Sequence, residues 1–173
     1  MTSIFVKVKL VGSEIKQLLK TMPQIGKVNW IGVRPGRRVP IKQLDEVEIG
    51  EQGLVGDRYG GSPNGKRMVT LIQAEHIAAV ASILGEKSID PALLRRNIVV
   101  SGINLQALKK NEFKIGEVVL FATGNCPPCS RMEENLGPGG YNAMRGHGGI
   151  TATVVNGGVI RVGTSLSLIS SPE

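Results

Sequence analysis

The sequence predicts a mainly β fold of the α+β kind, in which a closed or nearly closed β-barrel carries a few short flanking helices. Twenty-three glycines divide the 173 residues into many short β-branched runs, a pattern typical of closed β architectures. Apolar residues make up 41% of the chain and aromatic residues only 3%. We therefore expect one core that is built mainly from aliphatic side chains.

Each predicted strand is a short apolar run bounded by turn-forming residues. These runs cover residues 4–8, 28–33, 46–49, 68–72, 98–101, 118–123, 152–155, 159–162 and 166–169. Asn156-Gly157 lies between two of them and is typical of a tight hairpin turn, because both residues tolerate a positive φ. We therefore expect residues 152–155 and 159–162 to form a β-hairpin.

Few helices are expected. Residues 74–84 carry apolar side chains at the spacing i, i+3, i+4 and i+7, and Gly85 follows as a C-terminal cap. Asp90 and Pro91 are suited to the N-cap and the first position of a second, short helix. Residues 13–19 are expected to form a third.

No repeat or long linker divides the chain, so we expect a single domain over residues 1–173. The N-terminal strand and helix, within residues 1–27, are expected to pack on it. The glycine-rich residues 137–149 are expected to form a mobile loop close in sequence to the cysteines.

Charge and composition exclude several classes of function. The net charge is +7, but the basic residues occur in scattered pairs and aromatic stacking platforms are scarce, so we expect no nucleic-acid partner. No run of 18 apolar residues occurs and residues 1–7 alternate apolar with polar side chains, so we expect neither a membrane span nor a signal peptide. Two cysteines are too few to staple a secreted domain, which favours the reducing cytoplasm.

Both cysteines lie in Cys126-Pro127-Pro128-Cys129, directly after a predicted strand, and four interpretations compete. Both thiols could be small buried hydrophobes. Structural zinc would require His76 and His147 to converge on them. A thioredoxin-like redox pair fits the helix-compatible residues 130–135 but not the position of the motif after many strands. The fourth interpretation is a thiol that binds a soft metal or carries sulfur, beside a pocket for an anionic cofactor.

Two further loops support the fourth interpretation. The glycine-rich residues 53–61 are too rich in glycine for a strand, and Asp57 and Arg58 within them offer an acceptor and a planar guanidinium. Arg95-Arg96-Asn97 precedes a predicted strand and could bind phosphate or carboxylate bidentately. Taken alone, the first loop is better explained as a surface turn with an internal ion pair. The second loop has an alternative explanation as a helix C-terminus that carries favourable positive charge.

The order of these pieces along the chain resembles that of the MOSC domain, named for the C-terminal domain of molybdenum cofactor sulfurases. The resemblance runs over about residues 28–169 and rests on Gly56-Asp57-Arg58, Arg95-Arg96-Asn97 and Cys126 to Cys129, together with residues 67–72, 113–116 and 157–163. It implies a distorted β-barrel that binds the molybdenum cofactor, a pterin dithiolene (molybdopterin) carrying phosphate.

The resemblance also implies roles for individual residues. Cys129, the second cysteine of the motif, matches the residue that supplies a thiolate to molybdenum in the amidoxime-reducing relatives. Asp57 matches an acidic residue close to the metal and is expected to orient or protonate the substrate. Arg95 and Asn97 match the Arg-x-Asn pattern near the metal. Arg58 and Arg67 are candidates for cofactor binding, whereas the role of Cys126 stays open.

The activity implied is molybdenum-dependent reduction of a small N-hydroxylated substrate, with electrons from a partner protein. Tyr59 stands where relatives often carry histidine, so a proton relay that uses this position is expected to differ. The extra N-terminal subdomain of the larger reductases is absent, so cofactor binding is expected to be weaker or to depend on a homodimer or another protein. Two alternatives stay open. Cys129 would carry a persulfide received from a sulfur-donor protein, or the domain would bind the cofactor without catalysis.

Overall fold

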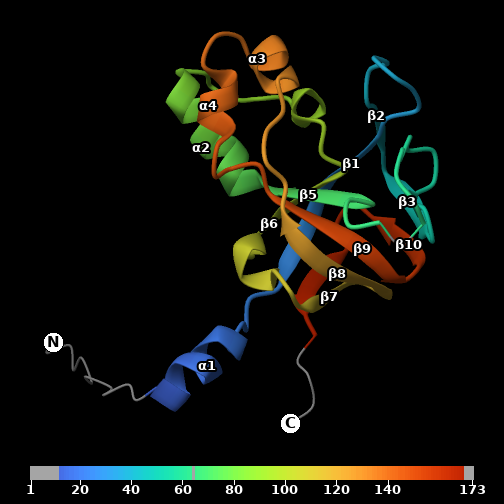
Figure 1. Ribbon diagram of the computed structural model, residues 1–173, viewed down its shortest axis with the longest axis vertical. Coiled ribbons are helices and arrows are strands. Elements are labelled where there is room, and N and C mark those ends of the chain that lie inside the picture. Colours follow the sequence, from blue (N-terminus) through green and yellow to red (C-terminus); the bar gives the residue numbers. More distant parts are fainter. Residues whose placement is uncertain (1–11, 64, 170–173) are drawn as a thin grey trace, which may run out of the picture.

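Seven strands close into a β-barrel in the computed structural model, which describes residues 12–63 and 65–169 (Figure 1). Their order is β11-β7-β8-β9-β5-β6-β1, and pairing of β11 with β1 closes the ring. Only β5 and β6 pair in parallel, so the chain between them crosses over through a helix. The strands are β1 (Gly26–Val33), β5 (Val69–Gln73), β6 (Ile98–Ser101), β7 (Glu112–Ile115), β8 (Val118–Asn125), β9 (Ile150–Asn156) and β11 (Ser165–Leu168).

The predicted mainly β fold is therefore confirmed. Four further strands complete it: β2 (Lys42–Leu44) extends the barrel sheet beside β1, whereas β10 (Gly158–Arg161), β3 (Glu46–Gly50) and β4 (Gly53–Leu54) form a separate sheet. The sequence did not predict β2, β4 or β7, and the glycine-rich residues 53–61 do begin with a strand, contrary to expectation. The predicted strand at residues 4–8 lies outside the described residues.

The predicted hairpin around Asn156-Gly157 is wrong. β9 pairs with β8 and β5 in the barrel, whereas β10 pairs with β3 in the small sheet. Gly157 is needed there for close approach, because a Cβ at this position would lie 2.5 Å from the backbone oxygen of Ile49. The turn therefore carries the chain from one sheet to the other.

Two apolar cores lie on opposite faces of the same strands. Inside the barrel, fully buried residues such as Leu71, Ile98 and Phe113 form an almost entirely aliphatic core. On the outer face, Ile72 and Val99 pack under a group of helices. We call these helices the helical cap: α2 (Ala74–Leu84), the 3₁₀ helix η1 (Pro91–Leu94), α3 (Arg131–Leu136) and α4 (Gly140–Met144). Figure 1 shows α2, α3 and α4 gathered on one side of the barrel.

Local signals place two cap elements correctly. α2 spans the predicted residues, and Gly85 ends it with a left-handed φ of 73°. The Asp90 side chain accepts a hydrogen bond of 2.9 Å from the Ala92 backbone N–H at the start of η1, which is a 3₁₀ helix instead of an α-helix. A further 3₁₀ helix, η2 (Leu105–Leu108), lies between β6 and β7.

Residues 137–149 are not the irregular loop that their glycines suggested, because they contain α4. Ala143 and Met144 are buried in the cap core. The Glu133 carboxylate accepts hydrogen bonds from the backbone N–H groups of Tyr141 (2.9 Å) and Gly139 (2.8 Å), which lowers the pKa of Glu133. The segment is therefore tied to α3 by both packing and hydrogen bonds.

The N-terminal helix α1 (Gly12–Lys20) covers the predicted helix at residues 13–19 but stands away from the barrel (Figure 1). Its apolar residues Ile15, Leu18 and Leu19 are all more than half exposed. The expected packing of residues 1–27 on the domain stays a prediction. Within the described residues, no helix is both long and apolar enough to cross a membrane.

Candidate functional site

The two cysteines occupy different environments between β8 and α3. Cys126 is 8% exposed, and its backbone N–H donates to the carbonyl oxygen of Gly149 at 2.9 Å. Burial raises the pKa of the Cys126 thiol, although Arg96 and other nearby guanidinium groups oppose this shift. Cys129 is exposed, and both thiols are free. The motif therefore offers one accessible sulfur atom and one protected sulfur atom.

Arg95 faces the accessible sulfur. It ends η1 in a left-handed conformation with φ of 59°, and its Nη1 atom lies 3.9 Å from Sγ of Cys129. Among the described residues, the other non-glycine residues with positive φ are Arg38 and Lys110. A positive φ is unfavourable for a residue that carries a Cβ atom, so the backbone holds Arg95 and Arg38 in conformations that cost free energy. Both side chains line the cleft described below.

Arg96 differs from Arg95, because its side chain is buried and donates its hydrogen bonds to backbone carbonyl groups. Its Nε atom donates to the carbonyl of Gly148 (2.7 Å), and its Nη1 atom donates to that of Leu94 (3.0 Å). Its Nη2 atom donates to the carbonyls of Cys126 (3.0 Å) and Pro127 (3.3 Å). Burial lowers the pKa of Arg96. Arg96 therefore ties the cysteine loop to the end of η1 and to the segment after α4.

Asn97 lies in the interior, 1% exposed, between β5 and β1. Its Oδ1 accepts from the backbone N–H and the hydroxyl of Thr70, at 3.1 and 2.8 Å. Its Nδ2 donates to the carbonyl of Gly32 at 3.2 Å. The amide is thus engaged in joining strands, and contact of Asn97 with a cofactor stays a prediction.

Asp57 is paired with an arginine that the sequence did not single out. Its carboxylate accepts from the backbone N–H of Arg34 (2.6 Å), from Nε (3.1 Å) and from Nη2 (2.8 Å). The Asp57 side chain is 1% exposed and that of Arg34 is 24% exposed. Asp57 therefore fixes the direction of Arg34, which lines the cleft. Proton transfer from Asp57 to a substrate stays a prediction.

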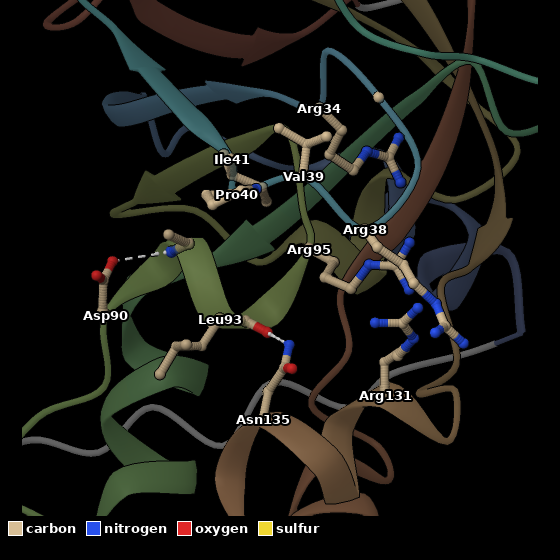
Figure 2. A pocket seen from close by; sticks show the side chains of 12 residues that line it. Arg34, Arg38, Val39, Pro40, Ile41, Asp90, Leu93, Arg95, Arg131 and Asn135 are labelled. Carbon is tan, nitrogen blue, oxygen red and sulfur yellow. Dashed lines mark hydrogen bonds between the residues drawn. The ribbon is translucent and has the colours of Figure 1, made fainter.

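A cationic cleft has two adjoining parts, and Arg95, which contacts Cys129, lines both of them. The large hollow, about 500 Å³, has an apolar wall that includes Val39, Pro40 and Leu93, and Figure 2 shows the guanidinium groups of Arg38, Arg95 and Arg131 converging at its other side. The second part, about 250 Å³, is lined only by arginine and glycine, and we call it the arginine hollow. It contains Arg34, Arg37, Arg38, Arg58, Arg95 and Arg131, with Gly36 and Gly60.

The structure thus brings together some of the predicted site residues and not others. Arg58 and Arg95 line the arginine hollow, and Arg95 contacts Cys129. Asp57 lines neither part of the cleft, and its ion pair with Arg34 links it to the cleft wall. Arg67 is exposed and lines neither part of the cleft. Arg34, Arg37, Arg38 and Arg131 were missed as site residues, because arginines in loops and at helix starts carry no local signal beyond surface charge.

The two histidines do not join the cysteines. His76 on α2 and His147 after α4 pack edge to face, with ring centroids 5.2 Å apart. Burial, followed by the nearby His147, lowers the pKa of His76. No group of three or more His, Cys, Asp and Glu side chains that could hold a metal ion occurs within residues 12–63 and 65–169. The zinc interpretation therefore has no ligand set in this part of the chain.

Solved structures share this fold. The YuaD protein from Bacillus subtilis superposes with a TM-score of 0.73 at 20% identity, over 86% of this chain and 97% of that one. YiiM from Geobacillus stearothermophilus gives 0.69 at 17% identity, over 83% and 75% of the two chains. YiiM from Escherichia coli gives 0.64 at 19% identity, over 85% and 71%.

The curated proteins include no match to this sequence. The family model of the MOSC domain, in contrast, matches residues 53–167. This match includes Asp57, the Arg95-Arg96-Asn97 segment and both cysteines, and it covers well over half of the sequence. The chain therefore belongs to the MOSC domain family.

Proposed function

We propose that this protein binds the molybdenum cofactor in the cationic cleft, with the Cys129 thiolate as a metal ligand. MOSC domains are generally linked to this cofactor, which supports the proposal at the level of the family. The single observation that carries it is the exposed sulfur of Cys129, with a guanidinium nitrogen of Arg95 at 3.9 Å and a cleft lined by further arginines.

The residues present fit such a group. A thiolate is a soft ligand suited to a metal that is also held by dithiolene sulfurs. Planar guanidinium groups bind phosphate oxygens bidentately, and Arg58 and Arg95 are placed for this in the arginine hollow. Gly36 and Gly60 add bare backbone to the same wall, which lets an anion approach closely.

The reaction proposed for this site is two-electron reduction of an N-hydroxylated compound. When bound, the cofactor supplies a redox metal that removes the hydroxyl oxygen from the substrate nitrogen. The N–O bond breaks, two protons and two electrons are consumed, and the N–H product and water form. An electron-donor protein supplies the electrons. Arg95 orients the Cys129 side chain, Arg96 holds the cysteine loop in place, and Asp57 keeps Arg34 directed into the cleft.

Metal analysis tests the binding step directly. Protein expressed in a host that makes the cofactor is expected to contain close to one molybdenum per chain. Cys129→Ser is expected to lose most of that metal, whereas Cys126→Ser, the matched control, is expected to retain it. Equal retention by both variants would refute the assignment of Cys129. Loaded protein is then assayed with hydroxylaminopurines or amidoximes and an artificial electron donor, and absence of turnover would leave a non-catalytic binding module.

A sulfur-carrier function is the second candidate, and the asymmetry of the two thiols favours it. The Cys129 thiolate would attack the terminal sulfur of a donor protein's persulfide, and the donor thiolate would leave. Because Cys126 is buried, it is poorly placed to resolve the resulting persulfide as a disulfide. Protein without molybdenum that carries a cyanide-labile sulfur, absent from Cys129→Ser, would establish this function in place of the first.

A further inference from the structure

The arginine hollow holds more positive charge than one phosphate group requires. Six guanidinium groups line it, and two of them are matched within the protein: Arg34 by Asp57 at 2.8 Å and Arg131 by Glu134 at 3.4 Å. The other four, Arg37, Arg38, Arg58 and Arg95, form no ion pair with any residue that the structure describes.

A phosphomonoester carries a charge of about −1.5 to −2 at neutral pH. One such group, as the proposed cofactor has, would match about two of the four, and the Cys129 thiolate lies 3.9 Å from a third, Arg95, so about one positive charge is left without a counter-charge. Like charges that share one concave surface repel each other and focus a positive potential into it. The hollow therefore attracts a second anion of the phosphate class.

The shape of the cleft indicates what kind of molecule carries this second anion. The arginine hollow shares Arg34, Arg38, Arg95 and Arg131 with the large hollow, so one ligand can extend from one part into the other. The opposite wall of the large hollow is apolar, and Val39 and Leu93 on it are 49% and 39% exposed. Figure 2 shows this wall across from the arginine side chains. A ligand with an apolar body and a phosphate group matches both surfaces.

Building on the proposed function, we propose that the substrate of this site is a phosphorylated small molecule. Its phosphate binds in the arginine hollow, with Arg37 among the residues that select it, and its apolar part lies against Val39, Pro40 and Leu93. Under this proposal the cleft accepts two phosphate-class groups at once, one from the cofactor and one from the substrate.

Titration of inorganic phosphate into molybdenum-loaded protein tests the second anion site. Saturable binding of one equivalent is expected, weakened about tenfold by Arg37→Gln, which removes one charge-assisted contact. Arg161→Gln is the matched control, because Arg161 is exposed, pairs with Glu46 and lies outside the cleft. No saturable binding to loaded protein, or equal weakening by both variants, would overturn the proposal.

Kinetics with a matched pair of compounds tests the substrate assignment. The probes are an N-hydroxylated adenosine and its 5′-monophosphate, with an artificial electron donor. The loaded wild-type protein is expected to show kcat/KM at least about tenfold higher for the monophosphate. Arg37→Gln is expected to bring this ratio close to one, and Arg161→Gln to preserve it. A ratio close to one in the wild type would overturn the inference.

Two controls separate this inference from the proposed function. Mass spectrometry of the released cofactor shows whether it carries one phosphate or a diphosphate. A diphosphate would assign the second anion to the cofactor and overturn the substrate inference, while the proposed function stands. Metal analysis that finds no molybdenum would refute the proposed function itself, and the substrate inference with it, whatever the phosphate titration gives.

Discussion

The barrel and the helical cap share strands β1, β5 and β6 but are held together by different forces. The barrel interior is almost entirely aliphatic, and backbone ladders close its ring. The cap has a smaller apolar core and depends in addition on one buried cation, Arg96, whose donors bind four carbonyl oxygens from three segments. Cys129 lies in a loop that this cation holds, so the site is attached to the more polar of the two regions.

The largest effect is expected in the barrel. Phe113 is fully buried in its core, and Phe113→Ala is expected to lower the free energy of unfolding by about 4 kcal/mol through lost burial and a new cavity. Chemical denaturation measures this loss. The folded variant should still show one fast and one slow thiol with a chromogenic disulfide reagent, because Arg96 is intact. Two fast thiols in the folded variant would contradict the separation of barrel from cap.

Arg96→Met is expected to act on the cap and to cost about 3 kcal/mol, because several buried carbonyls lose their donor. In contrast to the barrel variant, it should expose Cys126, so that both thiols react quickly in folded protein. Arg95→Met is the neighbouring control, with an expected loss under about 1 kcal/mol since this side chain forms no ion pair among the described residues. If Cys126 stays protected from the thiol reagent in Arg96→Met, the hydrogen bonds of Arg96 are not needed to hold the cysteine loop in place.

Local sequence signals predicted the parts of both regions that depend on neighbouring residues. α2 with Gly85 and η1 with Asp90 were predicted from caps and spacing, and β6 from its β-branched run. The hairpin error has a physical cause, because turn chemistry sets the bend but not which strand the next segment pairs with. β10 pairs with β3, more than a hundred residues earlier. The same limit hid α4, whose formation depends on packing of Ala143 and Met144 in the cap.

The residues of the site also divide into those that local sequence predicts and those that depend on distant contacts. The cysteine motif and Arg95 could be predicted because their residue types and spacing are local, whereas Arg34 could not, since its partner Asp57 lies 23 residues away. Arg95 and Arg96 are adjacent and chemically identical, yet one faces the cleft and the other is buried. Only the backbone, with its left-handed turn at Arg95, distinguishes them.

Asp57→Asn compares a buried ion pair with an exposed one. The amide cannot match both nitrogens of Arg34 as a carboxylate does, so a loss of about 2 kcal/mol in the free energy of unfolding is expected. Glu46→Gln breaks the exposed pair with Arg161, at 2.7 Å, and should cost under about 1 kcal/mol. Denaturation at neutral pH measures both variants. Equal losses would mean that burial of Asp57 adds nothing to its pair.

The smallest expected effect is a pH dependence at the contact between α2 and the segment after α4. The pKa of His76 is lowered from 6.5 in the folded protein, so below about pH 6.5 the unfolded chain binds more protons than the folded one. The contribution of His76 to stability is therefore intact above that pH and decreases as the pH falls towards the folded pKa. His76→Gln should lose less stability than the wild type between pH 7 and 5, measured by thermal unfolding. Because the shift comes first from burial and then from His147, His147→Gln should reduce the pH dependence only in part. A pH dependence in His76→Gln as steep as in the wild type would assign the acid sensitivity to groups outside this contact.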